Sequence, residues 1–93
     1  MNRFKIGDIV KHFKRELVKL LYNNTDPNMH LYIILGEAID PFTEKSMVIY
    51  KALYGNHTVY VRPVDEFESE IDDIRYPNIK QKYIFEKIDG SVV

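Results

Sequence analysis

The chain has 93 residues, of which 45% are hydrophobic and 29% charged, a composition typical of one small globular domain rather than of a disordered segment. Thirteen basic and fourteen acidic side chains leave a formal net charge of −1, so the whole chain lacks the positive charge that drives general binding to nucleic acid or anionic lipid. The absence of cysteine excludes a disulfide framework, a thiolate nucleophile and a cysteine-ligated metal centre. No apolar stretch approaches the roughly 18 residues of a membrane span, and no signal-like segment follows the N-terminus, so we expect a cytoplasmic protein.

Five strands are predicted from alternating hydrophobicity and from their β-branched and aromatic content. They are residues 9–13, 30–38, 46–53, 58–62 and 82–88. Gly55 and Asn56 suit a tight hairpin turn between the third and fourth strands, because both residue types tolerate positive φ. A bulge or bend is expected at Gly36 in the second strand. Pro63 is expected to end the ladder of the fourth strand, because proline has no backbone N–H to donate.

Two segments show helical signals. Residues 64–71 are predicted to form a short helix, since Pro63 suits a first-turn position and Asp65 and Glu66 suit the positive end of the helix dipole. Residues 14–21 are ambiguous: their leucines match a helical stripe, whereas residues 16–22 equally fit an extended strand. Both interpretations stay open at this point.

The order of these elements predicts a mainly β fold. Five short strands joined by tight turns, with one short helical turn before the last strand, favour a small SH3-like β-barrel in which residues 1–93 form a single domain. An oligonucleotide-binding-type barrel is the alternative, and the strand pattern alone does not separate the two.

Several short motifs resemble those of a known family. They are Lys11-His12-Phe13-Lys14, Val48-Ile49-Tyr50-Lys51-Ala52-Leu53-Tyr54-Gly55, Val59-Tyr60-Val61-Arg62-Pro63 and the later Phe67. Their order is similar to the YRHFK…YxxLYG…VRP…MF pattern of an uncharacterised bacterial family, domain of unknown function 1653. The resemblance covers nearly the whole chain and implies a shared fold, but the family brings no assigned reaction, ligand or partner. The chain departs from the pattern at residues 15–29, which look like an insertion, and at Glu66, where methionine is common.

Six residues in or beside these motifs form the predicted contact site. They are His12, Lys14, Tyr50, Tyr54, Tyr60 and Arg62. If the third and fourth strands pair as a hairpin, Tyr50 and Arg62 approach each other, with His12 on a neighbouring strand. Arginine offers a planar fork of donors suited to carboxylate or phosphate, and tyrosine adds a hydroxyl and a stacking face. The competing interpretation is a purely structural network, with Arg62 stacked on tyrosine and His12 satisfied in the interior.

No catalytic motif is visible in the sequence. The serines and threonines lie in no nucleophile motif, the four glycines form no phosphate loop, and the three histidines have no metal-ligand spacing, so no catalytic residue, metal or cofactor is predicted. We therefore expect a non-enzymatic binding or adaptor module whose partner is a protein or a small anionic ligand, and not a membrane. The alternative is a binder of nucleotides or single-stranded nucleic acid, or an enzyme acting on one, that uses Arg62 and the tyrosines against phosphate and base.

The insertion at residues 15–29 carries more apolar side chains than a loop without a role needs. Burying each of them is worth roughly 1.5–3 kcal/mol, so we expect them to cover something. We predict that residues 16–22 are ordered and pack their leucines against the barrel, while residues 23–28 are mobile. A homodimer formed through the same segment is the second option, because a short apolar segment can cover a sheet edge on either copy.

Overall fold

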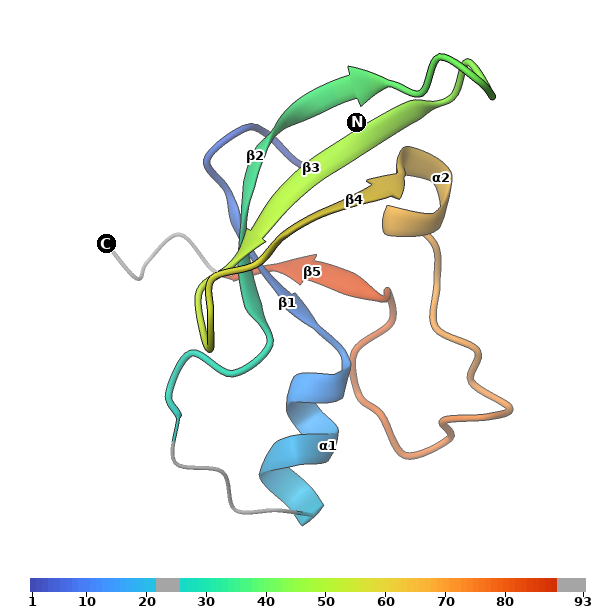
Figure 1. Ribbon diagram of the computed structural model, residues 1–93. Helices are drawn as coiled ribbons and strands as arrows, with labels where there is room; N and C mark the ends of the chain where they lie inside the picture. Colours follow the sequence, from blue (N-terminus) through green and yellow to red (C-terminus); the bar gives the residue numbers. More distant parts are fainter. Residues whose placement is uncertain (22–25, 89–93) are drawn as a thin grey trace.

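The computed structural model describes residues 1–21 and 26–88, which form one curled antiparallel sheet with two helices (Figure 1). The elements in chain order are β1 (Ile9–His12), α1 (Lys14–Leu21), β2 (Leu31–Ile39), β3 (Ser46–Ala52), β4 (Val59–Pro63), α2 (Val64–Phe67) and β5 (Phe85–Lys87). The strand order across the sheet is β4-β3-β2-β1-β5, and every pairing is antiparallel. The mainly β class, the five strands and the short helix before the last strand are therefore confirmed.

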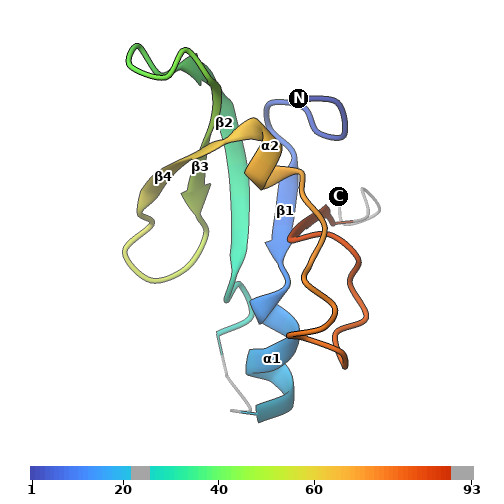
Figure 2. The same cartoon turned by 90° about the vertical axis from the view of Figure 1, so that its right-hand side faces the viewer.

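The sheet is open, in contrast to the barrel predicted from the sequence. β4 and β5 stand at opposite ends of the strand order and do not pair with each other within the described residues, as the side view in Figure 2 also shows. Side chains occupy the space between these two edges: the Arg62 guanidinium of β4 lies 5.4 Å from the ring centroid of Phe85 on β5. A direct backbone ladder between the edges would require that space.

α2 and β5 are both shorter than predicted, and the segments beside them pair with each other. Glu70 forms an isolated bridge with Tyr83, and the backbone N–H of Ile84 donates to the carbonyl of Ser69. The chain after α2 therefore leaves the helix early, which explains why α2 ends at Phe67 rather than near residue 71. β5 is limited to three residues because its partner β1 ends at His12, and the chain turns into α1 two residues later. Beyond the ladder, the Phe13 N–H still donates to the carbonyl of Ile84.

The two predicted irregularities in the strands have different outcomes. The pairing of β2 with β3 shifts register between Ile34 and Gly36, so the bulge expected at Gly36 is confirmed. The ladder ends at Pro63, as predicted, but not for want of its N–H, since Pro63 itself still pairs with Met47 as the last residue of β4. The N–H of Ala52 donates to the carbonyl of Thr58, and alternation along the ladder then turns the nitrogen of Pro63 toward the free edge. Proline is tolerated there because no ladder hydrogen bond is lost.

The core lies on the concave face of the sheet. The register places Ile34 beside Tyr50 and therefore on the same face. Phe67 of α2 and Phe85 of β5 close over this face, with stacked rings 4.1 Å apart, and both rings lie within 5.5 Å of the Tyr50 ring. The buried members of the core are Phe4, Val10, Tyr32, Ile34, Val48, Tyr50, Ala52, Phe67 and Phe85.

The beginning of the insertion is helical, which resolves the ambiguity at residues 14–21 in favour of a helix. The Glu16 carboxylate accepts hydrogen bonds from the N–H groups of Lys80 and Gln81, and this ties α1 to the loop before β5. Arg15 donates to the carbonyls of residues 27 and 29 and joins the two ends of the insertion. The packing predicted for Leu20 and Leu21 concerns side chains outside the described part of the structure, and the mobility predicted for residues 23–25 falls on residues outside it. In the described part of the chain, no helix is long and apolar enough to cross a membrane.

Gln81 fastens the loop before β5 to β1. Its side chain is buried, and its amide nitrogen donates to the carbonyls of Lys11, Tyr83 and Ile84 at 2.9–3.2 Å. Because β5 has only three residues, this amide adds a side-chain link to the backbone hydrogen bonds that join the C-terminal segment to β1. The sequence offered no signal for this role.

Replacing Gln81 by alanine is expected to lower the free energy of unfolding by about 1–2 kcal/mol, because three inward-facing carbonyls lose a donor. Urea unfolding followed by circular dichroism measures the loss. Asn78→Ala is the matched control, since Asn78 is exposed in the same loop and its variant should unfold at nearly the wild-type midpoint. Equal stability of the two variants would show that the Gln81 amide does not hold the loop.

Candidate functional site

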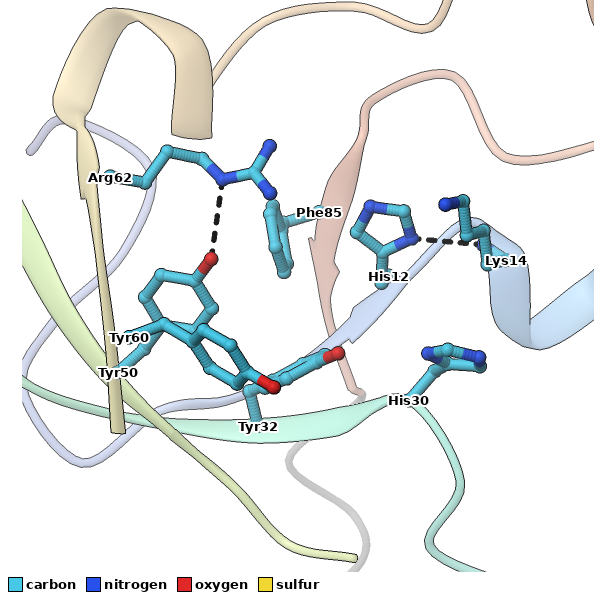
Figure 3. A pocket seen from close by; sticks show the side chains of 8 residues that line it. All are labelled: His12, Lys14, His30, Tyr32, Tyr50, Tyr60, Arg62 and Phe85. Atoms are coloured by element: carbon cyan, nitrogen blue, oxygen red, sulfur yellow. Dashed lines mark hydrogen bonds between the residues drawn. The ribbon is translucent and has the colours of Figure 1, made fainter. Parts of the chain in front are cut away.

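A pocket of about 190 Å³ opens on the concave face of the sheet, beside the Phe67–Phe85 stack. It is lined by His12, Lys14, His30, Tyr32, Tyr50, Tyr60, Arg62 and Phe85. The structure thus brings five of the six predicted contact residues to one place, and only Tyr54 lies outside the lining. Figure 3 shows these side chains converging on a shared space from the five strands, from the start of α1 (Lys14) and from the turn before β2 (His30).

Strand register explains why residues so distant in sequence meet here. Tyr60 lies directly opposite Tyr50, and Arg62 lies opposite the buried Val48, so β4 turns both side chains to the concave face. His12 lies opposite Phe85 in the pairing of β1 with β5 and shares that face. The expectation that Tyr50 and Arg62 approach across the hairpin is confirmed.

Arg62 is held on two sides. Its Nε donates to the Tyr50 hydroxyl at 3.2 Å, and its guanidinium lies against the Phe85 ring. Tyr50 is itself fixed, since only 3% of it is exposed and its ring stacks on Tyr60 at 5.6 Å. No further hydrogen bond engages the guanidinium within residues 1–21 and 26–88, so its terminal nitrogens are available to a ligand. Arg62 is therefore a preorganised donor at the mouth of the pocket.

His12 is a buried, neutral donor. Its Nδ1 accepts the backbone N–H of Lys14 at 3.1 Å, so in the neutral ring the proton sits on Nε2. Burial, followed by the positive charges of Arg62, His30 and Lys14, lowers the pKa of His12 to about 3. The Phe13 and Phe85 rings pack against the imidazole and fix its plane. Figure 3 shows Nε2 turned toward the side of the pocket where Arg62 lies.

A chain of hydroxyl groups forms the other wall. The Tyr32 and Tyr54 hydroxyls lie 2.8 Å apart, and the Tyr54 hydroxyl lies 3.4 Å from Nδ1 of His30. Burial and the bond to Tyr54 raise the pKa of Tyr32, so its hydroxyl stays protonated. Burial, with Lys14 and Arg15 nearby, lowers the pKa of His30. Tyr54 thus lies behind the pocket and positions Tyr32 and His30, although it does not line the pocket itself.

Three lining residues were not predicted from the sequence. Tyr32 precedes the core residue Ile34 by two positions, so alternation could have placed it on the concave face. Phe85 carries the same kind of signal, but its strand was predicted to be longer and its partner was unknown. His30 adopts a positive φ of 60° in the turn before β2, and nothing in the sequence marks that conformation.

The pocket is strongly asymmetric in charge. Two side chains with full positive charge, Lys14 and Arg62, line it together with histidine and tyrosine donors, and no carboxylate does. Neither cation makes an ion pair with any carboxylate in the described part of the chain. The hydrogen bonds of the competing structural network are present at the Tyr50 hydroxyl and at Nδ1 of His12. Within the described residues, that network does not use the terminal nitrogens of Arg62, the ammonium group of Lys14 or Nε2 of His12. Within residues 1–21 and 26–88 no group of three or more histidine, aspartate or glutamate side chains could hold a metal ion.

Comparison with known proteins identifies a family. Searches of curated proteins and of solved structures find no match. The family model described as "Protein of unknown function (DUF1653)" matches residues 8–81, which begin at β1 and end in the loop before β5. That span contains every pocket residue except Phe85. Because the match covers most of the chain, this protein belongs to the DUF1653 family.

Proposed function

We propose that this protein is a non-enzymatic binding module whose pocket takes the anionic end group of a ligand. The observation that carries the proposal is the lining itself, which brings Lys14, Arg62 and the neutral His12 donor together without a carboxylate. Charge-assisted hydrogen bonds to an oxyanion are the interactions that such a set makes best. A volume of about 190 Å³ lies below the roughly 300–1,000 Å³ of sites that enclose drug-sized ligands, which supports an end group rather than a whole cofactor.

We also propose that the fold is related to the SH3-like barrel and is open between its edge strands β4 and β5. Four strands in a meander, a short helix and a fifth strand that returns to pair with β1 support this assignment. The opening between β4 and β5 is then the place where the pocket forms. Arg62 and Phe85, which face each other from the two edges, form its rim.

Binding is better supported than catalysis. The lining contains no serine, threonine or carboxylate. Of its two histidines, His12 has its acceptor nitrogen engaged by the Lys14 N–H, and burial lowers the pKa of both, which makes them weaker bases. The raised pKa of Tyr32 works against its use as a base near neutral pH.

One observation favours a nucleotide as the second candidate ligand. Tyr60 is 42% exposed while its ring stacks on the buried Tyr50, so it offers a supported aromatic surface beside two cations. Bases stack on such surfaces with little regard to sequence.

Titration at low salt with sulfate, benzoate and phenyl phosphate tests the proposal by chemical-shift changes of the backbone amides. We expect shifts centred on His12, Lys14 and Arg62. Arg62→Gln should weaken binding at least tenfold, since a charged hydrogen bond is worth about 1.5–3 kcal/mol and 1.4 kcal/mol is a factor of ten.

Lys51→Gln is the matched control. It removes the same charge from β3, next to Tyr50 in sequence but on the opposite face of the sheet, and should bind within about twofold of wild type. Circular dichroism checks that each variant folds. If Arg62→Gln does not fold, Lys14→Gln provides a second test of the site. Wild-type affinity in both Arg62→Gln and Lys14→Gln, or the absence of binding by all three probes, would overturn the proposal.

A further inference from the structure

Resting on the proposed function, we propose that the anionic end group is a phosphomonoester in its dianionic form rather than a carboxylate. Three features of the pocket carry this inference: its charge, the directions from which its donors come, and the fixed protonation of His12. The first two distinguish a tetrahedral dianion from a planar monoanion, and the third keeps a donor available across the pH range in which the phosphate gains its second charge.

The charge of the pocket calls for two negative charges. Lys14 and Arg62 are the lining cations, and neither is compensated by a carboxylate within the described residues. A bound carboxylate carries one negative charge and would balance only one of them. A phosphomonoester carries close to two negative charges at neutral pH and balances both.

The donors approach from different elements. Arg62 extends from β4, His12 from the end of β1 and Lys14 from the first residue of α1, so the donors lie on two sides of the pocket, with Arg62 on one side and His12 and Lys14 on the other (Figure 3). A carboxylate is satisfied by a single planar guanidinium fork. The separate oxygens of a phosphate can meet Arg62, His12 and Lys14 at the same time.

His12 supplies its donor at every pH of interest. Because its folded pKa is about 3, the ring stays neutral and keeps a proton on Nε2 through the range where a phosphomonoester takes up its second charge. The other groups that face the pocket are Lys14, His30, Arg62 and the three tyrosines. Of these, His30 can gain a charge as the pH falls, and it would then strengthen the binding of any anion. A probe that stays dianionic throughout separates this effect from the ionisation of the ligand.

Calorimetric titration with phenyl phosphate, sulfate and benzoate, from pH 5 to pH 8 at constant ionic strength, tests the inference. Sulfate remains dianionic, so the ratio of phenyl phosphate affinity to sulfate affinity should rise about tenfold between pH 5 and pH 7, as the phosphate passes its second pKa near 6. At pH 7.5, phenyl phosphate should bind at least tenfold more tightly than benzoate, which has the same ring. Lys14→Gln should weaken phenyl phosphate binding more than benzoate binding, because the fork of Arg62 satisfies a carboxylate alone.

The outcomes separate this inference from the function on which it rests. If benzoate binds as tightly as phenyl phosphate, or if the affinity ratio stays flat with pH, the phosphomonoester is wrong and anion binding stands. If no probe binds, both proposals fall. If phenyl phosphate binds as expected, a comparison of adenosine 5′-monophosphate with ribose 5-phosphate identifies the kind of molecule that carries the phosphate. Preference for the nucleotide, lost in Tyr60→Leu, supports a base stacked on Tyr60, and equal binding supports a phosphate on a sugar alone.

Discussion

Replacing Phe85 by alanine is expected to lower the free energy of unfolding by about 3–5 kcal/mol, which is a large share of the roughly 5–15 kcal/mol that holds a small domain together. Phe85 is 1% exposed, and its ring stacks on Phe67 at 4.1 Å and meets the Tyr50 ring at 5.4 Å. It joins β5 to the concave face, and β5 has only three residues with which to hold itself there. Loss of the ring therefore removes most of what anchors the C-terminal strand.

Urea unfolding measures this loss, with Phe42→Ala as the matched control. Phe42 is 95% exposed in the turn between β2 and β3, so removing the same ring there should change stability by less than about 0.5 kcal/mol. Phe85→Leu keeps apolar volume and should fall between wild type and Phe85→Ala. A loss below 1 kcal/mol in Phe85→Ala would show that the aromatic stack is not the centre of the core.

The elements of the fold could be predicted from local patterns, and their closure could not. Alternation in β3 separates the face of Val48, Tyr50 and Ala52 from its neighbours, and these three residues are buried. The closure of the sheet depends on contacts between distant segments: residues 82–84 pair with residues 69–71, and β5 is short because its partner β1 ends at His12. A sequence pattern indicates that a segment is extended, but it does not show with which other segment that segment pairs.

The residues of the candidate site likewise fall into those that could be predicted from the sequence and those that could not. Residues carried by strands with clear alternation, such as Tyr50, Tyr60 and Arg62, were predicted and meet in the pocket. His30 was missed because it reaches the pocket from a turn with positive φ. The protonation of His12 was equally out of reach, since it depends on burial of the ring, on the Arg62 charge brought by β4 and on the Lys14 N–H at Nδ1. The chemistry of the pocket is thus decided by tertiary contacts that join predictable strands.

His12 is expected to make the protein sensitive to acid. The folded pKa is about 3, well below the unfolded value of 6.5, so only the unfolded chain takes up a proton as the pH falls through this window. The contribution to stability is fully present above pH 6.5 and decreases by about 1.4 kcal/mol per pH unit until the pH approaches 3. His30, whose pKa is also lowered, acts in the same direction.

The variant His12→Gln isolates this contribution from the titration of the carboxylates, because the latter are shared with the wild-type protein. At pH 7.5 the variant should be the less stable of the two, since Nδ1 no longer accepts the N–H of Lys14 and the ring no longer packs between Phe13 and Phe85. The unfolded variant has no imidazole to protonate, so its disadvantage should shrink by about 2–3 kcal/mol between pH 7.5 and pH 4.5. Urea unfolding of both proteins at the two pH values measures the difference. A disadvantage that stays constant would show that His12 titrates alike in the folded and unfolded chains. It would contradict the lowered pKa expected from the burial of His12 and from the nearby Arg62 charge.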